Sequence, residues 1–236
     1  MKRAYCLGLT VFVCLSAAGL VAGCSVTEST NVETSGIWAR YVVEHDAQDR
    51  VTAWGTLRVG GPLGTIVDLV AGEHLEVNGT EMTEWYEPIT DYHWSRAIVA
   101  PTADGRYDID FVRTDSVVPS TVVMPERPTI TDATPFDLVE THDTLTVYWD
   151  NSAPGDAIEI TVEGDCIERQ EHDQVPETGE FTTDPINDRT LAQTEDCLIT
   201  VTVLRWVYGF VSSSFNAGLT EAYIMDEHNL IFETIY

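Results

Sequence analysis

The chain has 236 residues and carries 39 acidic against 12 basic side chains, for a formal net charge of −27 at pH 7. A surface this negative repels nucleic acid and anionic lipid headgroups, so no nucleic-acid partner is expected. The same charge attracts cations and cationic proteins or peptides, although solubility alone would also explain it.

The first residues have the architecture of an export signal. Lys2 and Arg3 precede an apolar stretch from Tyr5 to Ala22, and small residues lead into Cys24. This pattern predicts that residues 1–23 are a signal peptide that takes no part in the fold. The alternatives are a membrane anchor or an ordinary signal peptide, but the apolar run is near the lower limit for spanning a bilayer.

The end of this stretch, Leu20-Val21-Ala22-Gly23-Cys24, resembles the lipobox of bacterial lipoproteins. The resemblance implies cleavage before Cys24 and acyl chains on its thiol, which would tether the mature protein to a membrane. Each buried methylene contributes roughly 0.8 kcal/mol, so two or three chains anchor a protein almost permanently. By similarity to enteric sorting, Ser25 implies the outer membrane, and a lipid-anchored location in the cell envelope is expected.

Residues 24–36 are rich in Ser, Thr, Glu and Asn and are expected to form a flexible stalk. After them hydrophobicity alternates with period two, and turn residues recur every 8–12 positions, which is typical of β-sandwich domains. Residues 37–44 and 51–59 are the first expected strands. Asn78-Gly79 suits a type I′ hairpin turn, and Asp104-Gly105 is expected to play the same part.

The segment from Glu84 to Trp94 is dense in aromatic and acidic residues and is expected to be a loop. Exposed rings beside carboxylates suit a sugar, whose apolar face the rings cover, and they equally suit a cationic ligand. The alternative is that the rings cap one end of a sandwich, because aromatic side chains contribute much of the core area. The candidate ligand-binding residues are Trp85, Tyr86, Tyr92 and Trp94.

In the expected strand 106–112 the odd positions are apolar and the even positions are charged. That alternation is typical of a strand with one face in solvent. No cofactor is expected, and the only metal candidates are weak ones for calcium, because the stretch lacks the ligand pattern of an EF-hand loop. These weak candidates are Asp104, Asp108 and Asp110.

Pro125 to Pro128 is expected to be a short, stiff connector. It divides the chain into a first β-sandwich domain over residues 37–124 and a second over residues 125–236. Alternating apolar residues predict strands in the second domain at 144–150, at 157–163 and from Cys197 onward. Four aromatic residues at the end of the last of these are expected in the core: Trp206, Tyr208, Phe210 and Phe215.

Leu145-Thr-Val-Tyr-Trp149 resembles the second strand of fibronectin type III and immunoglobulin-like domains, where such residues fill a sandwich core. The resemblance implies an immunoglobulin-like architecture. The expected fold class is therefore all-β, with two β-sandwich domains after a signal peptide and a flexible stalk. Immunoglobulin domains join the second and sixth strands by a disulfide, whereas Cys166 would follow the third, which departs from that topology.

The five cysteines divide into three groups. Cys6 and Cys14 leave with the signal peptide, and Cys24 takes the lipid. Cys166 and Cys197 remain as an even pair in an oxidising compartment, and both share the parity of the inward-facing residues of their strands. They are expected to form one disulfide.

No nucleophile elbow, zinc-protease motif, phosphate-binding loop or Cys-x-x-Cys is present, and the six histidines are scattered. The expectation is a lipid-anchored cell-envelope protein that is not an enzyme and serves as a binding or structural module. Its partners would be the membrane, through the anchor, and a glycan or another envelope protein. The alternatives are a carbohydrate-recognition lipoprotein that uses residues 84–94 and an unrecognised extracytoplasmic hydrolase.

Overall fold

The computed structural model describes residues 26–87, 92–134, 144–150, 157–164, 167–185 and 197–232. Within these ranges the chain forms seventeen strands and two single turns of 3-10 helix, η1 (Ser29–Asn31) and η2 (Thr34–Gly36). The strands are β1 (Val26–Glu28), β2 (Ile37–His45), β3 (Val51–Val59), β4 (Thr65–Asp68), β5 (His74–Val77), β6 (Thr80–Glu81), β7 (Thr83–Glu87), β8 (Tyr92–Val99), β9 (Arg106–Val112), β10 (Val117–Val123), β11 (Ile130–Thr134), β12 (Thr146–Trp149), β13 (Ala157–Gly164), β14 (Ile167–Val175), β15 (Glu180–Thr182), β16 (Cys197–Tyr208) and β17 (Ala217–Phe232).

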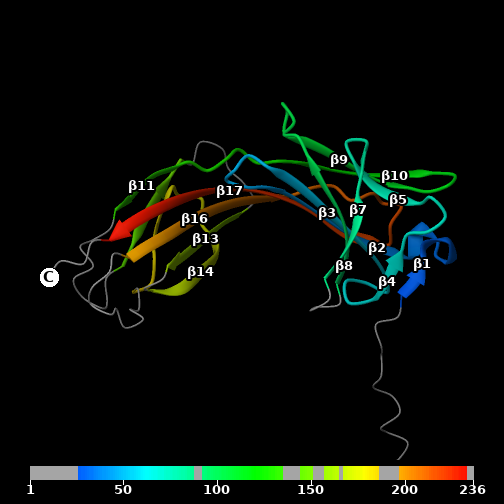
Figure 1. Ribbon diagram of the computed structural model, residues 1–236, viewed down its shortest axis with the longest axis horizontal. Helices are drawn as coiled ribbons and strands as arrows, with labels where there is room; N and C mark the ends of the chain where they lie inside the picture. Colours follow the sequence, from blue (N-terminus) through cyan, green and yellow to red (C-terminus); the bar gives the residue numbers. More distant parts are fainter. Residues whose placement is uncertain are drawn as a thin grey trace, which may run out of the picture.

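One long sheet runs through the whole molecule. Its main path is β1-β4-β3-β2-β17-β16-β13-β14, and the β7–β8 hairpin joins it at β3. Two smaller sheets, β10-β9-β5-β6 and β11-β12-β15, are built from the remaining strands. In Figure 1 β16 and β17 form an arch along the length of the molecule, with β9, β10 and β11 above it. The two smaller sheets therefore cover one face of the long sheet, and the all-β, sandwich-type prediction is confirmed.

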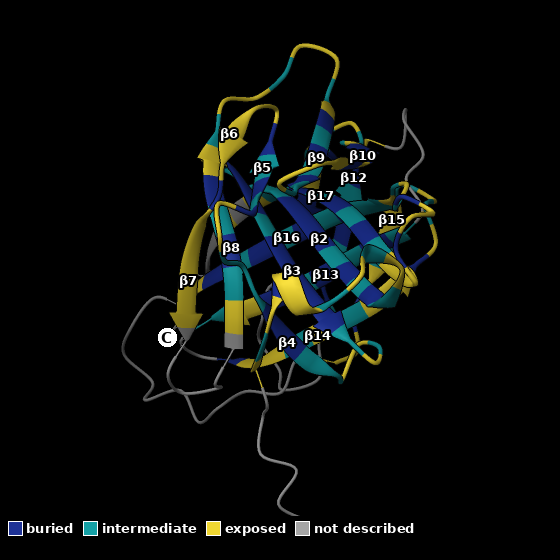
Figure 2. Ribbon diagram, turned by 90° about the vertical axis from the view of Figure 1, so that its right-hand side faces the viewer, coloured by how far each residue is buried: buried dark blue, intermediate teal, exposed yellow. Residues whose placement is uncertain are grey.

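Two separate hydrophobic cores lie between the long sheet and its covers. The first packs inward residues of β2 and β3 against those of β5, β9 and β10, among them Tyr41, Leu75 and Phe111. Along β13 and β16 buried residues alternate with more exposed ones, and β2 shows the same alternation as far as Tyr41 (Figure 2). The predicted alternation in β9 is confirmed, because the side chains of its odd positions are buried: Tyr107, Ile109 and Phe111.

The second core is mainly aliphatic and follows the predicted parity closely. Leu145, Val147 and Trp149 point into it from the covering sheet. From the long sheet β13 contributes its even positions and β16 its odd positions. These residues are all buried: Ile158, Ile160, Val162, Ile199, Val201 and Val203.

The second half of the sequence contributes a strand that pairs directly with a strand of the first half. The first half of β17 pairs in parallel with β2, from Ala217 opposite Trp38 to Ile224 opposite His45. Phe215 lies in the first core, where its ring stacks on Phe111 at a centroid distance of 6.2 Å. The division expected at residue 124 did not include this contribution of the second half to the first core.

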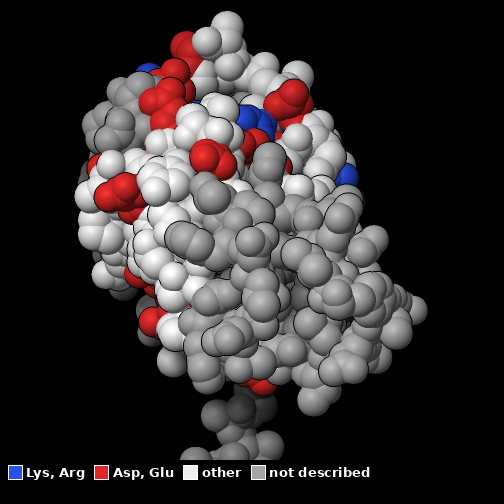
Figure 3. Space-filling view, turned by 90° about the vertical axis from the view of Figure 1, so that its left-hand side faces the viewer, with Lys and Arg blue, Asp and Glu red and all other residues white. Residues whose placement is uncertain are grey.

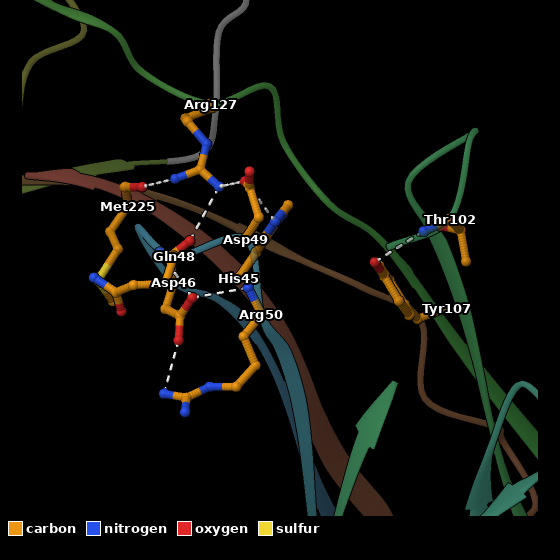
Figure 4. A network of polar contacts seen from close by, with 9 residues as sticks. All are labelled: His45, Asp46, Gln48, Asp49, Arg50, Thr102, Tyr107, Arg127 and Met225. Atoms are coloured by element: carbon orange, nitrogen blue, oxygen red, sulfur yellow. Dashed lines mark hydrogen bonds and ion pairs between the residues drawn. The ribbon is translucent and has the colours of Figure 1, made fainter. Parts of the chain in front are cut away.

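The connector between the halves is held by two arginines. The Arg127 guanidinium donates to the carbonyl oxygens of Asp46 and Met225 and to Asp49 Oδ1, which ties the connector to the β2–β3 turn and to β17 (Figure 4). Arg205 is 1% exposed and donates to the Glu126 carbonyl oxygen at 2.8 Å. The expected stiff connector is thus fastened on both sides.

Two local expectations are wrong. Residues 26–36 are not a stalk, because β1 pairs in parallel with β4 and the Arg113 guanidinium donates to the Ser29 and Val32 carbonyl oxygens. Asp104-Gly105 is not a hairpin turn either, because β8 and β9 lie in different sheets. Asn78-Gly79 does form the predicted turn between β5 and β6, with φ of 47° and 74°.

Candidate functional site

The candidate site lies where the edge of β3 changes partners. On this edge β3 pairs with β8 from Val51 to Gly55 and with β4 at Arg58 and Val59. Among the described strands none pairs with Thr56 and Leu57 on this side. The β7–β8 hairpin and β4 therefore diverge like the arms of a fork.

A cavity of about 320 Å³ occupies the fork, and we call it the fork pocket. Apolar residues of β3, β4 and β5 line its inner part, and the β7–β8 hairpin forms one wall. The lining is divided about equally between apolar and polar groups, and a concave site that combines apolar and aromatic side chains with polar groups suits a small ligand. Its lining residues include Val26, Leu57, Ile66, Val67, Asp68, Leu75, Glu84, Trp85, Tyr86, His93 and Trp94.

The aromatic segment expected as a loop is instead this two-stranded hairpin, in which Trp85 pairs with Trp94 and Tyr86 with His93. Trp85 is 40% exposed and Tyr86 is 49% exposed, while Trp94 is partly buried. Most of β7 is exposed in Figure 2. Residues 88–91 and the Tyr92 side chain lie outside the described part. Three of the four predicted rings therefore reach the fork pocket.

A third tryptophan supports the two in the hairpin. Trp54 of β3 meets Trp85 edge to face at a centroid distance of 5.8 Å and Trp94 at 6.3 Å. The Arg96 guanidinium carbon lies 4.6 Å from the centre of the Trp54 ring. Such edge-to-face contacts add about 0.5–1.5 kcal/mol per pair beyond burial, so they hold the rings in fixed positions.

The polar groups of the fork pocket come from three elements. Glu84 and Asp68 supply carboxylates, and the His93 ring lies against Tyr86 with centroids 4.7 Å apart. Thr56 is 4% exposed, and its hydroxyl oxygen has no hydrogen-bond partner among the described residues. A buried polar atom without a partner costs stability, so Thr56 is the group that a ligand's hydrogen bond would satisfy.

Sequence reasoning missed Thr56, Asp68 and His93, because the strands that carry them come together only in the folded sheet. The expectation that Trp206, Tyr208, Phe210 and Phe215 all lie in the core is also wrong. Only Phe215 is in a core, while Tyr208 is 54% and Phe210 is 57% exposed. The signal was available, because Trp206 and Tyr208 have the parity opposite to the inward-facing Val201 and Val203.

The three weak calcium candidates are not gathered into a ligand set. Asp104 accepts the backbone N–H of Arg106, and Asp108 accepts the Arg106 side chain at 2.8–2.9 Å. Burial, followed by the charges of Glu76 and Asp108, raises the pKa of Asp110. Within the described ranges no three His, Cys, Asp or Glu side chains are close enough together to hold a metal ion.

Two of the predicted site assignments fall outside the described residues. Cys24 and Cys166 are not described, and for Cys197 only the backbone is, paired with Phe232 of β17. Lipidation and the disulfide therefore stay predictions. Over the part of the chain that the structure covers, no helix is long and apolar enough to cross a membrane.

Comparison with known proteins gave only distant likenesses. No protein-family model and no curated protein matched the chain. Domains A168–A170 of titin match at 9% identity and a TM-score of 0.23, over 82% of this chain and 66% of that one. The chicken CNTN1 FN1–FN3 domains match at 13% identity and a TM-score of 0.22, over 74% and 62%. The chain thus spans just under two thirds of each structure, and at these TM-scores neither carries an argument about it.

Proposed function

We propose that this protein is a lipid-anchored, non-catalytic binding module of the bacterial cell envelope, and that the fork pocket is its ligand site. The observation that carries the proposal is the exposure of Trp85 and Tyr86 at the mouth of a cavity that also holds carboxylates. Core-capping aromatics would be buried, whereas these rings present a large part of their surface to solvent.

The ligand class that fits best is a saccharide without acidic groups. Flat rings cover the apolar face of a pyranose, and Glu84 and Asp68 accept hydrogen bonds from its hydroxyls. Thr56 adds a hydroxyl that has no protein partner in the described structure. Acidic sugars are disfavoured, because the pocket carboxylates and the overall negative charge repel them.

The proposed lipid anchor would also determine where the fork pocket lies in the cell. Val26 lines the fork pocket and lies two residues after Cys24, a stretch of chain that spans at most about 7 Å. Lipid on Cys24 would therefore keep the pocket close to the membrane surface. By the resemblance at Ser25, that surface would belong to the outer membrane, and the ligand would be a glycan of the envelope.

A cationic ligand is the second candidate, and one observation favours it. The Arg96 guanidinium already lies over Trp54, so the tryptophan cluster accepts a cation. A free cation entering the fork pocket would meet the Trp85 ring and the Glu84 carboxylate, which both line it.

The test is glycan-array binding of the soluble chain that starts at residue 25. Its truncation removes no contact of the described fold. We expect Trp85→Ala or Tyr86→Ala to abolish binding, because each removes an exposed ring from the pocket. Phe210→Ala is the matched control, since Phe210 is also an exposed ring but lines a different surface pocket, beside Thr121 and Tyr208.

Two other results would overturn the proposal. Equal binding by the hairpin variants and the Phe210→Ala control would mean that the hairpin is not the site, and binding of basic peptides alone would favour the cationic candidate. The anchor has its own test: mass spectrometry of the native protein should show an acylated Cys24, and an unmodified amino terminus upstream of it would refute lipidation.

A further inference from the structure

One face of the long sheet is not covered by any sheet formed from the described strands. Side chains on this open face come from the even positions of β16 and the odd positions of β17, whereas the opposite parity fills the cores. In Figure 1 the covering strands β9, β10 and β11 lie above the arch, so the open face is on its inner side. The open face is therefore a concave surface along the molecule.

A groove of about 520 Å³ lies on the open face over the second half of the sheet. We call it the acidic groove. Its floor is apolar and aromatic, made of Leu204, Trp206, Tyr223 and Met225. Trp206 meets Tyr208 edge to face at a centroid distance of 4.7 Å. Large apolar side chains at solvated sheet positions are a signature of binding surfaces.

Carboxylates surround this floor. Glu159 and Asp173 stand on one side, on β13 and β14, and Glu221 stands on the other, on β17. Glu221 is paired with Arg40 at 3.1 Å. Neither Glu159 nor Asp173 forms an ion pair with any residue that the structure describes. Seen from the end of the molecule where β17 finishes, the described atoms include several acidic and few basic side chains (Figure 3).

The electrostatic state of two groups agrees with this geometry. Burial, followed by the repulsion of Asp173 and Glu171, raises the pKa of Glu159. Burial also raises the pKa of Tyr223, and the charge of Glu44 and the hydrogen bond that Tyr223 donates to it come next. Among the described residues, negative charge is thus in excess over an aromatic floor, although Arg169 offsets part of it at Glu159 and Arg40 offsets part of it at Glu221.

We propose that the acidic groove binds the basic side chains of a cationic peptide segment, with an arginine stacked on Trp206 and its guanidinium held by Glu159 and Asp173. Charge complementarity and the flat ring both select this occupant, because a guanidinium stacks on aromatic faces and pairs with carboxylates. The protein itself shows the stacking on the same open face, where Arg96 lies over Trp54. This site is separate from the fork pocket and does not depend on its function.

The test uses a capped peptide of alternating arginine and glycine, titrated calorimetrically into the chain that starts at residue 25. We expect saturable binding that weakens as salt is raised. A peptide with citrulline in place of arginine has nearly the same shape without the charge and should not bind. Trp206→Ala should weaken binding at least about fivefold, since it removes the stacking surface.

Two controls separate a built site from general attraction to an acidic protein. The double variant Glu159→Gln with Asp173→Asn should lose most of the affinity. The double variant Glu81→Gln with Asp115→Asn loses the same charge at exposed positions away from the groove and should keep it. Equal losses in the two double variants, or binding of the citrulline peptide, would overturn the proposal.

Folding and independence are checked in the same samples. Trp206→Tyr keeps a ring and should retain more affinity than Trp206→Ala, and circular dichroism should show the same strand content for both. Trp85→Ala should leave peptide binding unchanged. If Trp85→Ala instead abolished it, the peptide would be a ligand of the fork pocket, and the acidic groove would have no role.

Discussion

The fork pocket and the acidic groove use the same kinds of side chain but are assembled in different ways. The aromatic wall of the fork pocket comes from one hairpin, so Trp85 and Trp94 are close in sequence as well as in space. The acidic groove is assembled from β13, β14, β16 and β17, whose contributing residues span Glu159 to Met225. A site that is local in sequence can be recognised from composition, whereas a site built across strands is visible only once the sheet register is known.

Their supports also differ. Among the described strands, the β7–β8 hairpin is hydrogen-bonded to the sheet through the pairing of β8 with Val51–Gly55 alone. The floor of the acidic groove lies on β16 and β17, which pair along the whole length of β16. On the opposite face of β16, the Arg205 guanidinium donates to the Asp150 carbonyl oxygen. We therefore expect changes beneath the groove to act on stability and changes in the hairpin to act mainly on binding.

The largest effect should come from Arg205→Ala. Arg205 is buried, forms an ion pair with Glu177 and donates to the carbonyl oxygens of Glu126 and Asp150. Its removal leaves buried acceptors without a donor, which should cost about 3–5 kcal/mol in the free energy of unfolding, measured in urea. Arg169→Ala, which breaks exposed pairs with Glu163 and Glu171, should cost less than about 1 kcal/mol. Similar losses from the two variants would contradict the proposed role of Arg205.

The predicted disulfide would reinforce the same region. In the β13–β16 ladder Gly164 pairs with Ile199, Cys166 follows Gly164 by two residues, and Cys197 precedes Ile199 by two. Replacing both cysteines with serine should lower the free energy of unfolding by roughly 3–4 kcal/mol, if chain entropy governs the effect. Detection of two reactive thiols in denatured, unreduced protein would refute the bond.

The alternation of apolar and polar residues along single strands gave the most reliable predictions. It placed the inward residues of β9, β12, β13 and β16 correctly, because a two-residue period is a property of each strand by itself. Applied to Trp206 and Tyr208, the same rule would have placed them on the open face, but their size suggested a core. Parity was the better guide there than hydrophobicity.

Long-range pairing could not be read from any local pattern. The parallel pairing of β17 with β2 joins segments about 180 residues apart. Nothing in the sequence of either strand indicates which strand it will pair with. The packing of residues 26–36 depends likewise on Arg113 and β4, so their polar composition suggested a stalk. Only Trp85, Tyr86 and Trp94 of the fork pocket could be predicted, because they are neighbours in one hairpin.

Single substitutions should separate the two sites. Trp85→Ala should weaken saccharide binding by more than about tenfold, beyond about 1.4 kcal/mol and below what an array detects, and should leave the arginine peptide unaffected. Trp206→Ala should do the reverse. Parallel titrations of both ligands with both variants would check this, and a variant that weakened both ligands equally would show that the sites are not independent.

The pH dependence of stability should have opposite signs in the two halves. Burial, followed by the charge of Arg127, lowers the pKa of His45 below its usual 6.5 (Figure 4). The folded state thus binds this proton less tightly than the unfolded state, so the contribution of His45 is present above about pH 6.5 and is lost as pH falls through the folded pKa. His45→Gln should flatten that decline in urea unfolding between pH 7 and pH 5. An unchanged slope would contradict this assignment.

Glu159 should act in the other direction and with the smallest effect. Its folded pKa is raised above the usual value of 4.5, so ionisation as pH rises destabilises the folded state. Glu159→Gln should therefore raise the free energy of unfolding at pH 7 by less than about 1 kcal/mol, after allowance for partial solvent exposure. The same variant should weaken binding of the arginine peptide. A loss of stability on this substitution would mean that Glu159 has a structural partner.

The most direct measurement is glycan-array binding by the chain from residue 25, compared with its Trp85→Ala and Phe210→Ala variants. The exposed hairpin rings predict that the parent and Phe210→Ala bind the same neutral or amino sugars and that Trp85→Ala does not. Binding that survives in Trp85→Ala, or a parent protein that binds no glycan on the array, would contradict a saccharide site in the fork pocket.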